Sequence, residues 1–499
     1  MGIALELARI KTAKSNLKTA INAKGGTLGV ETLDGYAAAV DALPSGGVPA
    51  GDIRVRFIDY DGTILQEDFI NSGDGVVPPI DPLHIGLTFQ GWNYASSAFS
   101  NITSNLDVGA MYITDDGRTR MKIRLTTISG LVVPVYLSKS DTSTLTINWG
   151  DTTSSTATNN DIFTITHTYT AIGDYTIEMW ISSGTGTYGL GAGTSSYTVI
   201  GGAVQNYRST LLCINIGSGV TSITTYAFYA CYALTSITIP NGVMSIEADA
   251  FFACYSLTSV TIPSSVTSIG ASAFYNCLAL ASITIPNGIT SIEASTFYCC
   301  YSLASITIPN GVTSIGASAF YYCFVLTSIT IPDGVTSIGI SAFNNCLALA
   351  SITIPSSVTS IGASAFFDCY PLTSITIPNG VTSIGVSAFG NCLALTSIII
   401  PSSVTSIGDS AFGSCYSLAS ITIPSSVTSI GVSAFSNCFG VKYYNFESTI
   451  APTVTTTTFT GILSSTKIYV PDASVNEYKT ALVWKTTYAN YIYPVSTME

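Results

Sequence analysis

The sequence predicts a mainly β protein dominated by a solenoid of 23-residue repeats. Ten cysteines, ten phenylalanines and nine prolines each recur at this interval over nearly half of the 499-residue chain. The cysteines on this ladder are Cys231, Cys254, Cys277, Cys300, Cys323, Cys346, Cys369, Cys392, Cys415 and Cys438. A fixed period of this length indicates stacked units, each of which buries its apolar face only against its neighbours.

One repeat, residues 234–256, shows how a unit is built. Leu234, Ile237 and Ile239 have the L-x-x-I-x-I spacing of a leucine-rich-repeat strand. Pro240 ends the strand because it cannot donate a ladder hydrogen bond, and the Asn-Gly pair after it turns the chain. The apolar groups that follow, up to Cys254, are expected to point inward, so stacking removes them from water.

The motif S-I-T-I-P…V-T-S-I-G-x-S-A-F…C recurs almost unchanged along residues 209–446. It resembles the BspA-like leucine-rich repeats of bacterial surface proteins. The resemblance implies a leucine-rich-repeat solenoid over this range, with about ten turns in a rod of roughly 50 Å. Residues 447–499 resemble the end of such arrays, where I-Y-V-P precedes a closing helix, and are expected to cap the open end.

The ladder cysteines are interpreted as small buried hydrophobic residues. A disulfide is the less favoured alternative, because parallel Cβ vectors on neighbouring turns hold the Cβ atoms too far apart for a relaxed bridge. Metal binding is disfavoured as well, since the solenoid has no histidine and no C-x-x-C pair. Cys213 and Cys299 lie off the ladder and are expected to be the more exposed thiols.

The charge pattern excludes several classes of partner. Only 9% of residues are charged, the net charge is −12, and residues 209–441 contain no lysine or arginine. Nucleic-acid binding needs a basic surface, so it is not expected, and an anionic membrane is disfavoured for the same reason. The chain has no apolar run of 18 residues or more, so membrane insertion is not expected either.

Residues 1–47 are expected to form a helical attachment segment. Residues 3–23 have apolar spacing typical of an amphipathic helix, and a second short helix is predicted over residues 33–43. The segment resembles the N-terminal part of many phage tail and virion-attached proteins of Gram-positive hosts. The resemblance implies docking to other virion proteins. The alternative is a small helical oligomerisation cap, and a homo-oligomer, such as a trimer, is expected in either case.

Two small β modules are predicted between this segment and the solenoid. Residues 52–92 resemble a Listeria–Bacteroides repeat, a β-grasp-like spacer, through F-I-D-Y-D-G-T and G-L-T-F-Q-G-W; His84 there is a lone histidine without a second ligand. Residues 93–205 are predicted as a strand-rich connector followed by an immunoglobulin-like sandwich that resembles the PKD type. Trp149 and Tyr175 are expected to fill its core, while Asp151 and His167 are expected to fix turns and strand ends.

No catalytic, cofactor-binding or metal-binding residues are predicted, because the chain has only two histidines and no nucleophile–base arrangement. Two solenoid faces are candidates for binding. The first is the strand face, where Ser236 and Thr238 begin ladders of hydroxyl groups that suit a repetitive polymer or merely confer solubility. The second is the column after the ladder phenylalanines, which varies between repeats, as does the column beside it. The aromatic residues of these two columns either form the candidate binding face or serve partial core packing. They are Tyr229, Phe252, Tyr275, Tyr298, Tyr321, Tyr322 and Phe367.

The expected function is that of a non-enzymatic bacteriophage virion protein. A tail fibre that binds a receptor through its solenoid is favoured, with bacterial surface polysaccharide or protein as the partner. The N-terminus lacks the apolar core of a signal peptide, which suits assembly in the host cytoplasm and release by lysis. The alternatives are a capsid-mounted head fibre or decoration protein and a bacterial cell-surface adhesin.

Overall fold

The computed structural model describes residues 53–191 with short gaps, Val199, and all of residues 211–498. The helices predicted in residues 1–47, and His84, lie outside the described residues. The predicted fold class is confirmed, because the described chain is mainly β and its largest part is a solenoid of parallel strands. No helix in the described part of the chain is long and apolar enough to cross a membrane.

The chain divides into two compact units, of which the first comprises residues up to 82 and residues 91–110. Here β1 (Ile53–Ile58) pairs antiparallel with β2 (Ile64–Ile70) and parallel with the start of β4 (Leu106–Thr114). Alternate residues of β1, including Val55 and Phe57, are buried in a small core of their own. A further strand, β3, covers Leu87–Trp92.

The second unit begins with two sheets that share one apolar core and together form a sandwich. The first sheet contains β5 (Thr119–Leu125), β10 (Gly173–Ser183), β7 (Thr144–Asn148) and β8 (Ser154–Ala157). The second sheet contains β9 (Ile162–Thr168), β6 (Val132–Lys139) and β11 (Tyr188–Leu190). Trp149 is fully buried between them, as predicted. The expectation for Tyr175 is wrong in part: it is only half-buried at the margin, and Tyr169 takes the buried position beside it.

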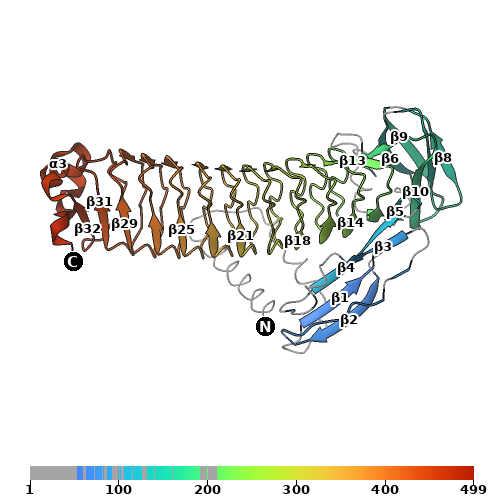
Figure 1. Ribbon diagram of the computed structural model, residues 1–499, viewed down its shortest axis with the longest axis horizontal. Helices are drawn as coiled ribbons and strands as arrows, with labels where there is room; N and C mark the ends of the chain where they lie inside the picture. The colour runs from blue at the N-terminus through green and yellow to red at the C-terminus, as the bar shows by residue number, and fades with distance from the viewer. Residues whose placement is uncertain are drawn as a thin grey trace. The chain divides into compact units, whose positions relative to one another are not determined.

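Both of these sheets continue into the solenoid. The first solenoid strand, β12 (Leu211–Asn215), pairs antiparallel with β5, and β13 (Val220–Ile223) pairs parallel with β11. The result is an eight-stranded and a six-stranded sheet that each run from the sandwich into the first turns of the solenoid (Figure 1). The sandwich therefore covers the backbone edge of the first turn, which would otherwise be unpaired.

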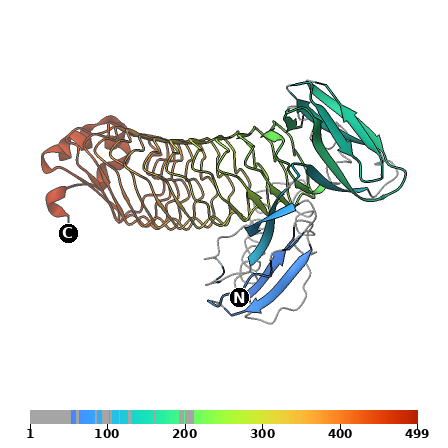
Figure 2. The ribbon, with the colours of Figure 1, turned by 45° about the vertical axis from the view of Figure 1, so that its right-hand side comes forward.

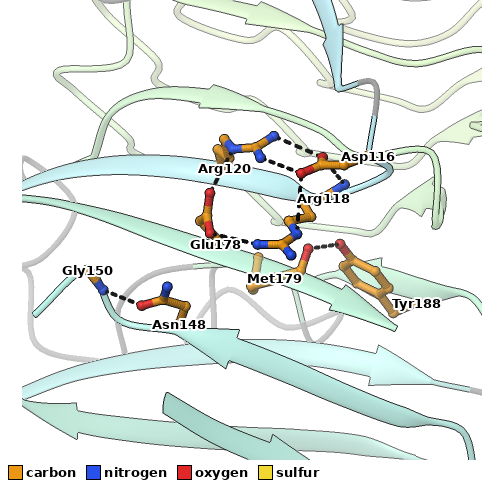
Figure 3. A network of polar contacts seen from close by, with 8 residues as sticks. All are labelled: Asp116, Arg118, Arg120, Asn148, Gly150, Glu178, Met179 and Tyr188. Carbon is orange, nitrogen blue, oxygen red and sulfur yellow. Dashed lines mark hydrogen bonds and ion pairs between the residues drawn. The ribbon is translucent and has the colours of Figure 1, made fainter. Parts of the chain in front are cut away.

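The junction is closely fitted and polar. A Cβ atom at Gly217 would lie 2.2 Å from the carbonyl oxygen of Gly117, so only glycine is tolerated at this approach. The Gly217 amide donates to the Thr119 hydroxyl at 2.9 Å, and Thr119 Oγ1 lies 2.6 Å from the Tyr188 hydroxyl. Tyr188 in turn donates to the Met179 carbonyl of β10 (Figure 3).

A charged network braces the same strands on their other side. Arg120 contacts Glu178 at 2.8 Å and Asp116 at 2.6 Å, and Arg118 contacts Glu178 at 3.1 Å (Figure 3). The guanidinium of Arg118 also lies 4.0 Å from the ring centroid of Trp180. Because β5 supplies Arg120 and β10 supplies Glu178, these contacts join β10 to β5, the strand that pairs with the first solenoid strand.

Solenoid repeats carry two short strands, where one was predicted, except that the first-row strand at residues 305–307 is reduced to isolated bridges at Thr307. The first row follows the S-I-T motif: β14 (Ser236–Thr238), β16 (Ser259–Thr261), β18 (Ser282–Ile283), β21 (Ser328–Thr330), β23 (Ser351–Thr353), β25 (Ser374–Thr376), β27 (Ser397–Ile399), β29 (Ser420–Ile423) and β31 (Tyr443–Phe446). The second row follows the later S-I pair: β15 (Ser245–Ile246), β17 (Ser268–Ile269), β19 (Ser291–Ile292), β20 (Ser314–Ile315), β22 (Ser337–Ile338), β24 (Ser360–Ile361), β26 (Ser383–Ile384), β28 (Ser406–Ile407) and β30 (Ser429–Ile430). Equivalent residues of successive repeats pair in parallel, so the sequence period becomes the spacing between turns.

Phenylalanine and cysteine fill the centre of every turn. The ladder phenylalanines stack from Phe228 to Phe435 with ring centroids 5.1–5.7 Å apart. From Cys254 to Cys438, each ladder thiol donates to the carbonyl of a phenylalanine 26 residues earlier, at 3.1–3.3 Å. All ten ladder cysteines are buried and free of disulfides, which confirms that they act as small core residues.

The expectation that Cys299 is exposed is wrong. Its side chain is 5% exposed, and burial raises the pKa of its thiol to about 11. The reason is tertiary, because tyrosines from its own and neighbouring repeats surround it, including Tyr275, Tyr298 and Tyr301. The Cys213 side chain lies outside the described residues.

The C-terminal residues pack onto the last turn. Strands β32 (Lys467–Val470) and β33 (Ile492–Pro494) extend the first row in parallel. Phe459 continues the phenylalanine stack, 5.6 Å from Phe435. Trp484 is buried against this end and donates from Nε1 to the Pro452 carbonyl at 2.8 Å. The helical elements follow the last turns (Figure 2) and are α3 (Val475–Thr480), η5 (Trp484–Tyr488) and the 3-10 turns η4 (Asp472–Ser474), η6 (Ala489–Tyr491) and η7 (Val495–Thr497).

Candidate binding face of the solenoid

Five of the predicted binding residues form one continuous stack. The ring centroids are 4.8 Å apart between Tyr229 and Phe252, 4.5 Å between Phe252 and Tyr275, and 4.3 Å between Tyr275 and Tyr298. Tyr321 ends the stack 4.8 Å from Tyr298. All five rings are half-buried, so they combine the predicted partial core packing with an accessible edge. Packing against one another fixes their rotamers before any ligand arrives.

A tyrosine stands against each end of this stack. Tyr226 lies edge-on to Tyr229, with centroids 5.5 Å apart. Tyr322, which was predicted, lies edge-on to Tyr321 at 4.3 Å and also contacts Phe324 at 5.4 Å. Tyr226 was not predicted, because the sequence does not show that its ring turns toward the stack.

The backbone explains why the column beside the stack varies. Each repeat has two residues with φ between +52° and +61°, a region that favours glycine, asparagine and aspartate. The first position is serine in most repeats. The second holds Asn276, Asn345, Asp368, Asn391 and Asn437 among others. Backbone conformation therefore accounts for the asparagine and aspartate residues that fill half of this column, and Tyr322 is its one aromatic residue.

Phe367 does not join the stack. It belongs to a repeat two turns beyond Tyr321, and the intervening position is Asn344, whose side chain is buried. Its ring lies over Gly390, where an added Cβ atom would be 2.8 Å from the Phe367 ring. The structure thus gathers six of the seven predicted residues and leaves Phe367 packed on the following turn.

A second aromatic column was missed in the sequence. The residue directly after each ladder cysteine is aromatic or leucine: Tyr232, Tyr255, Leu278, Tyr301, Phe324, Leu347, Tyr370, Leu393, Tyr416 and Phe439. Several are more exposed than the predicted stack, and Tyr416 reaches 47%. Tyr301 stacks on Phe324 at 4.6 Å, and Phe324 touches Tyr322, so the two columns meet there. The constant apolar character of this column was the available signal.

The aromatic face carries no basic side chain and meets a carboxyl group at each end, because Tyr226 is hydrogen-bonded to Asp249 and Asp368 interacts with Tyr321. Burial, with a hydrogen bond to Tyr322, raises the pKa of Tyr321 to about 12, and burial likewise raises the pKa of Tyr275. Residues 209–441 contain no lysine or arginine. The nearest acid to the stack's C-terminal end is Asp368, whose pKa is raised by burial. The tyrosines are thus neutral hydrogen-bonding groups on a surface without cations.

The threonine hydroxyls of the two strand rows differ in exposure and in hydrogen bonding. On the first strand row, threonines such as Thr330, Thr353 and Thr376 are exposed, and Ile399 takes the equivalent place with 65% exposure. On the second row, threonine hydroxyls bond to the carbonyl of the threonine one repeat earlier, as Thr336 does to Thr313 at 3.3 Å. Only the first row therefore presents the hydroxyl array that the sequence suggested.

Two other features lie outside the aromatic face, a hollow in the solenoid and a histidine–aspartate pair in the sandwich. A shallow hollow of about 480 Å³ lies between Glu247 and Glu293 and is lined in part by Gly270. In the sandwich, His167 Nε2 lies 2.6 Å from Asp151, and its ring stacks on Trp149, as predicted for a residue that fixes a strand end. No group of three or more histidine, cysteine, aspartate or glutamate side chains suited to a metal ion occurs among the described residues.

The repeats were compared with known protein families. Residues 221–350 and 336–466 match the profile of the BspA type leucine-rich repeat region. The chain belongs to the BspA-type leucine-rich repeat family. The BspA-type resemblance inferred from the sequence is thereby confirmed for the solenoid, whereas the PKD, Listeria–Bacteroides and phage resemblances stay predictions.

Solved leucine-rich-repeat structures are similar to this BspA-type chain. A leucine-rich repeat protein from Bacteroides ovatus is 31% identical, with 48% of this chain and 73% of that chain covered and a TM-score of 0.41. A leucine-rich cell surface protein from Faecalibacterium prausnitzii is 29% identical, with 56% and 83% covered and a TM-score of 0.30. A pneumococcal vaccine antigen is 19% identical, with 56% and 85% covered and a TM-score of 0.34. No curated protein matches the chain.

Proposed function

We propose that this BspA-type protein is a non-enzymatic adhesin that contacts a cell surface through its solenoid. The observation that carries the proposal is the aromatic face from Tyr226 to Tyr322, which is half-exposed, preorganised and free of basic side chains. Aromatic residues of this kind are enriched where proteins bind their partners. Repeat solenoids characteristically use an extended surface for binding.

The proposal also concerns which particle displays the adhesin, a virion or a bacterial cell. We favour a bacteriophage tail fibre on the strength of residues 1–47, which resemble virion-attachment segments and would dock to other virion proteins as part of a homo-oligomer. A capsid-mounted head fibre or decoration protein shares this support. The family match favours the remaining alternative, an adhesin on a bacterial cell.

Immunogold electron microscopy distinguishes the carriers. An antibody against residues 211–446 should label the tail tip of virions in the producing culture. Label over the capsid would favour a head fibre, and label on cells with bare virions would overturn the virion proposal.

A binding assay tests the adhesive function itself. The fluorescently tagged full chain should bind host cells saturably, and a chain without residues 1–47 should retain that binding while losing incorporation into virions. Absence of saturable binding to any host cell would contradict the adhesin proposal.

A further inference from the structure

We propose that the aromatic face from Tyr226 to Tyr322 is a bounded site for a neutral, extended polysaccharide that lies along the solenoid axis. The inference rests on the proposed adhesive function and names its ligand class. It is carried by three observations: bulky residues in strained positions at both ends of the stack, the absence of basic side chains, and the pairing of the backbone amides beneath the rings.

The strained residues mark the limits of the site. Tyr226 and Tyr322 both have φ of +61°, a conformation that is an outlier for bulky side chains. They are the only aromatic residues among the described left-handed positions of the solenoid. Sister repeats place Ser272 and Asn345 at the equivalent positions. Backbone strain of this kind is concentrated at functional sites.

The length of the face suits a chain of several sugar rings. Tyr229 to Tyr321 spans four intervals between turns, or roughly 19 Å at about 4.8 Å per interval. Beyond Tyr321 the stack is interrupted by the buried Asn344. Because the rings recur once per turn along a straight row, they match a linear polymer better than a compact ligand.

The charge distribution selects a neutral ligand. With no lysine or arginine in residues 209–441, an anionic polymer would find no counter-charge. Tyr298 and Tyr321 have pKa values raised by burial, so their hydroxyls stay protonated and available as donors and acceptors. Tyrosine combines apolar ring area with one polar group at a small entropy cost, which suits a sugar that presents C–H faces and hydroxyls together.

The backbone beneath the rings disfavours a peptide ligand. Its amides are already bonded to the next turn along the whole face: Ala230 to Phe252, Ala253 to Tyr275, Asn276 to Tyr298, Cys299 to Tyr321 and Tyr322 to Asn344, at 2.6–3.0 Å. A strand added to a sheet needs unpaired main-chain groups for its affinity. A peptide would therefore find these main-chain amides already occupied.

The test is affinity electrophoresis of the full chain in gels that contain a neutral glucan, mannan or galactan, the anionic polymer alginate, or the cationic polymer chitosan. At least one neutral polymer should retard the protein, and the charged polymers should not. Tyr321→Asn copies the repeat that carries Asn344 and should weaken retardation at least tenfold. Tyr416→Ser, at an exposed tyrosine outside the site, should leave it unchanged.

The second variant separates binding from folding. Tyr322→Asn copies Asn345 and relieves the strained backbone, so the melting temperature should rise while affinity falls at least fivefold. A raised melting temperature with unchanged affinity would overturn the inference, as would retardation by charged polymers only or by none of the polymers.

A whole-cell binding assay tests the polysaccharide site separately from the proposed adhesive function. Loss of cell binding in the Tyr321→Asn and Tyr322→Asn double variant would support the inference. If the double variant adheres to host cells like the unmodified chain, the adhesive function stands and the proposed site falls.

Discussion

The hydroxyl of Thr119 lies 2.6 Å from the hydroxyl of Tyr188, in the plane where the sandwich meets the solenoid. Thr119 is the first residue of β5 and Tyr188 is the first residue of β11, so the contact joins the two sandwich strands that pair with the solenoid. Because Thr119 also accepts from Gly217, the first solenoid turn is hydrogen-bonded to the sandwich by side chains as well as by strand pairing.

Replacement of Tyr188 with phenylalanine should destabilise this junction. The change removes a fully buried hydroxyl that contacts the Thr119 hydroxyl and the Met179 carbonyl. Both partners then lose a hydrogen bond, and each buried polar group left unsatisfied costs about 1–3 kcal/mol. Urea denaturation monitored by circular dichroism should show a lower midpoint. Tyr175→Phe is the matched control, since that hydroxyl is near the surface and should matter little. Equal midpoints for the two variants would contradict the structural role of the junction.

Removal of one ring from the phenylalanine stack should be costly. Phe343 is fully buried between Phe320 and Phe366, and truncation of a buried phenylalanine to alanine costs about 3–5 kcal/mol. Phe343→Ala should therefore lower the free energy of unfolding by an amount in this range. Phe439→Ala, at a ring that is 46% exposed, should change it by about 0.5 kcal/mol or less. A similar loss in both variants would mean that the core does not depend on the stack.

The cysteines of the solenoid should resist labelling in the folded protein. Burial raises the pKa of Cys323 and its ladder neighbours and of Cys299, and the thiolate is the reactive form. A Cys213→Ser variant should release almost no colour with Ellman's reagent at pH 8 and should react at all eleven remaining thiols in guanidinium chloride. Fast reaction of even one thiol in the native variant would show that the ladder, or Cys299, is accessible.

The stability of the solenoid should depend on the ionisation of Asp368. Burial raises its pKa, so the folded protein favours the protonated form more than the unfolded chain does. The stabilising contribution is present below the ordinary aspartate pKa of 3.8 and is lost as pH rises through the raised value. Asp368→Asn retains the polar group next to Asn391 and should raise the melting temperature at pH 7 by a few degrees, with a smaller gain at pH 4.

The control for this prediction is Asp333→Asn, at an exposed turn of a neighbouring repeat. It should leave the melting temperature nearly unchanged at both pH values. A gain for Asp368→Asn that is the same at pH 4 and pH 7 would assign the effect to the left-handed backbone, where asparagine is favoured, and not to charge.

Much of the solenoid could be predicted because its contacts are periodic. Tyr275 and Tyr298 are 23 residues apart, and a 23-residue turn places such residues one strand spacing apart, so their stacking follows from the sequence alone. The same argument placed the ladder cysteines in the core. The strand end at Pro240 followed from local chemistry, because proline has no amide to donate.

Contacts that do not recur at the 23-residue interval were decided by the tertiary structure alone. The pairing of β5 with β12 joins segments about ninety residues apart through backbone hydrogen bonds, which any sequence of suitable hydropathy can make. Burial of Cys299 depends on tyrosines from other turns, and the position of Tyr226 against Tyr229 depends on a positive φ that its residue type does not announce. The sequence by itself thus determined which residues repeat and stack, because spacing sets those contacts. The structure decided how the solenoid is closed and where its aromatic face begins and ends, because these depend on the path of the backbone.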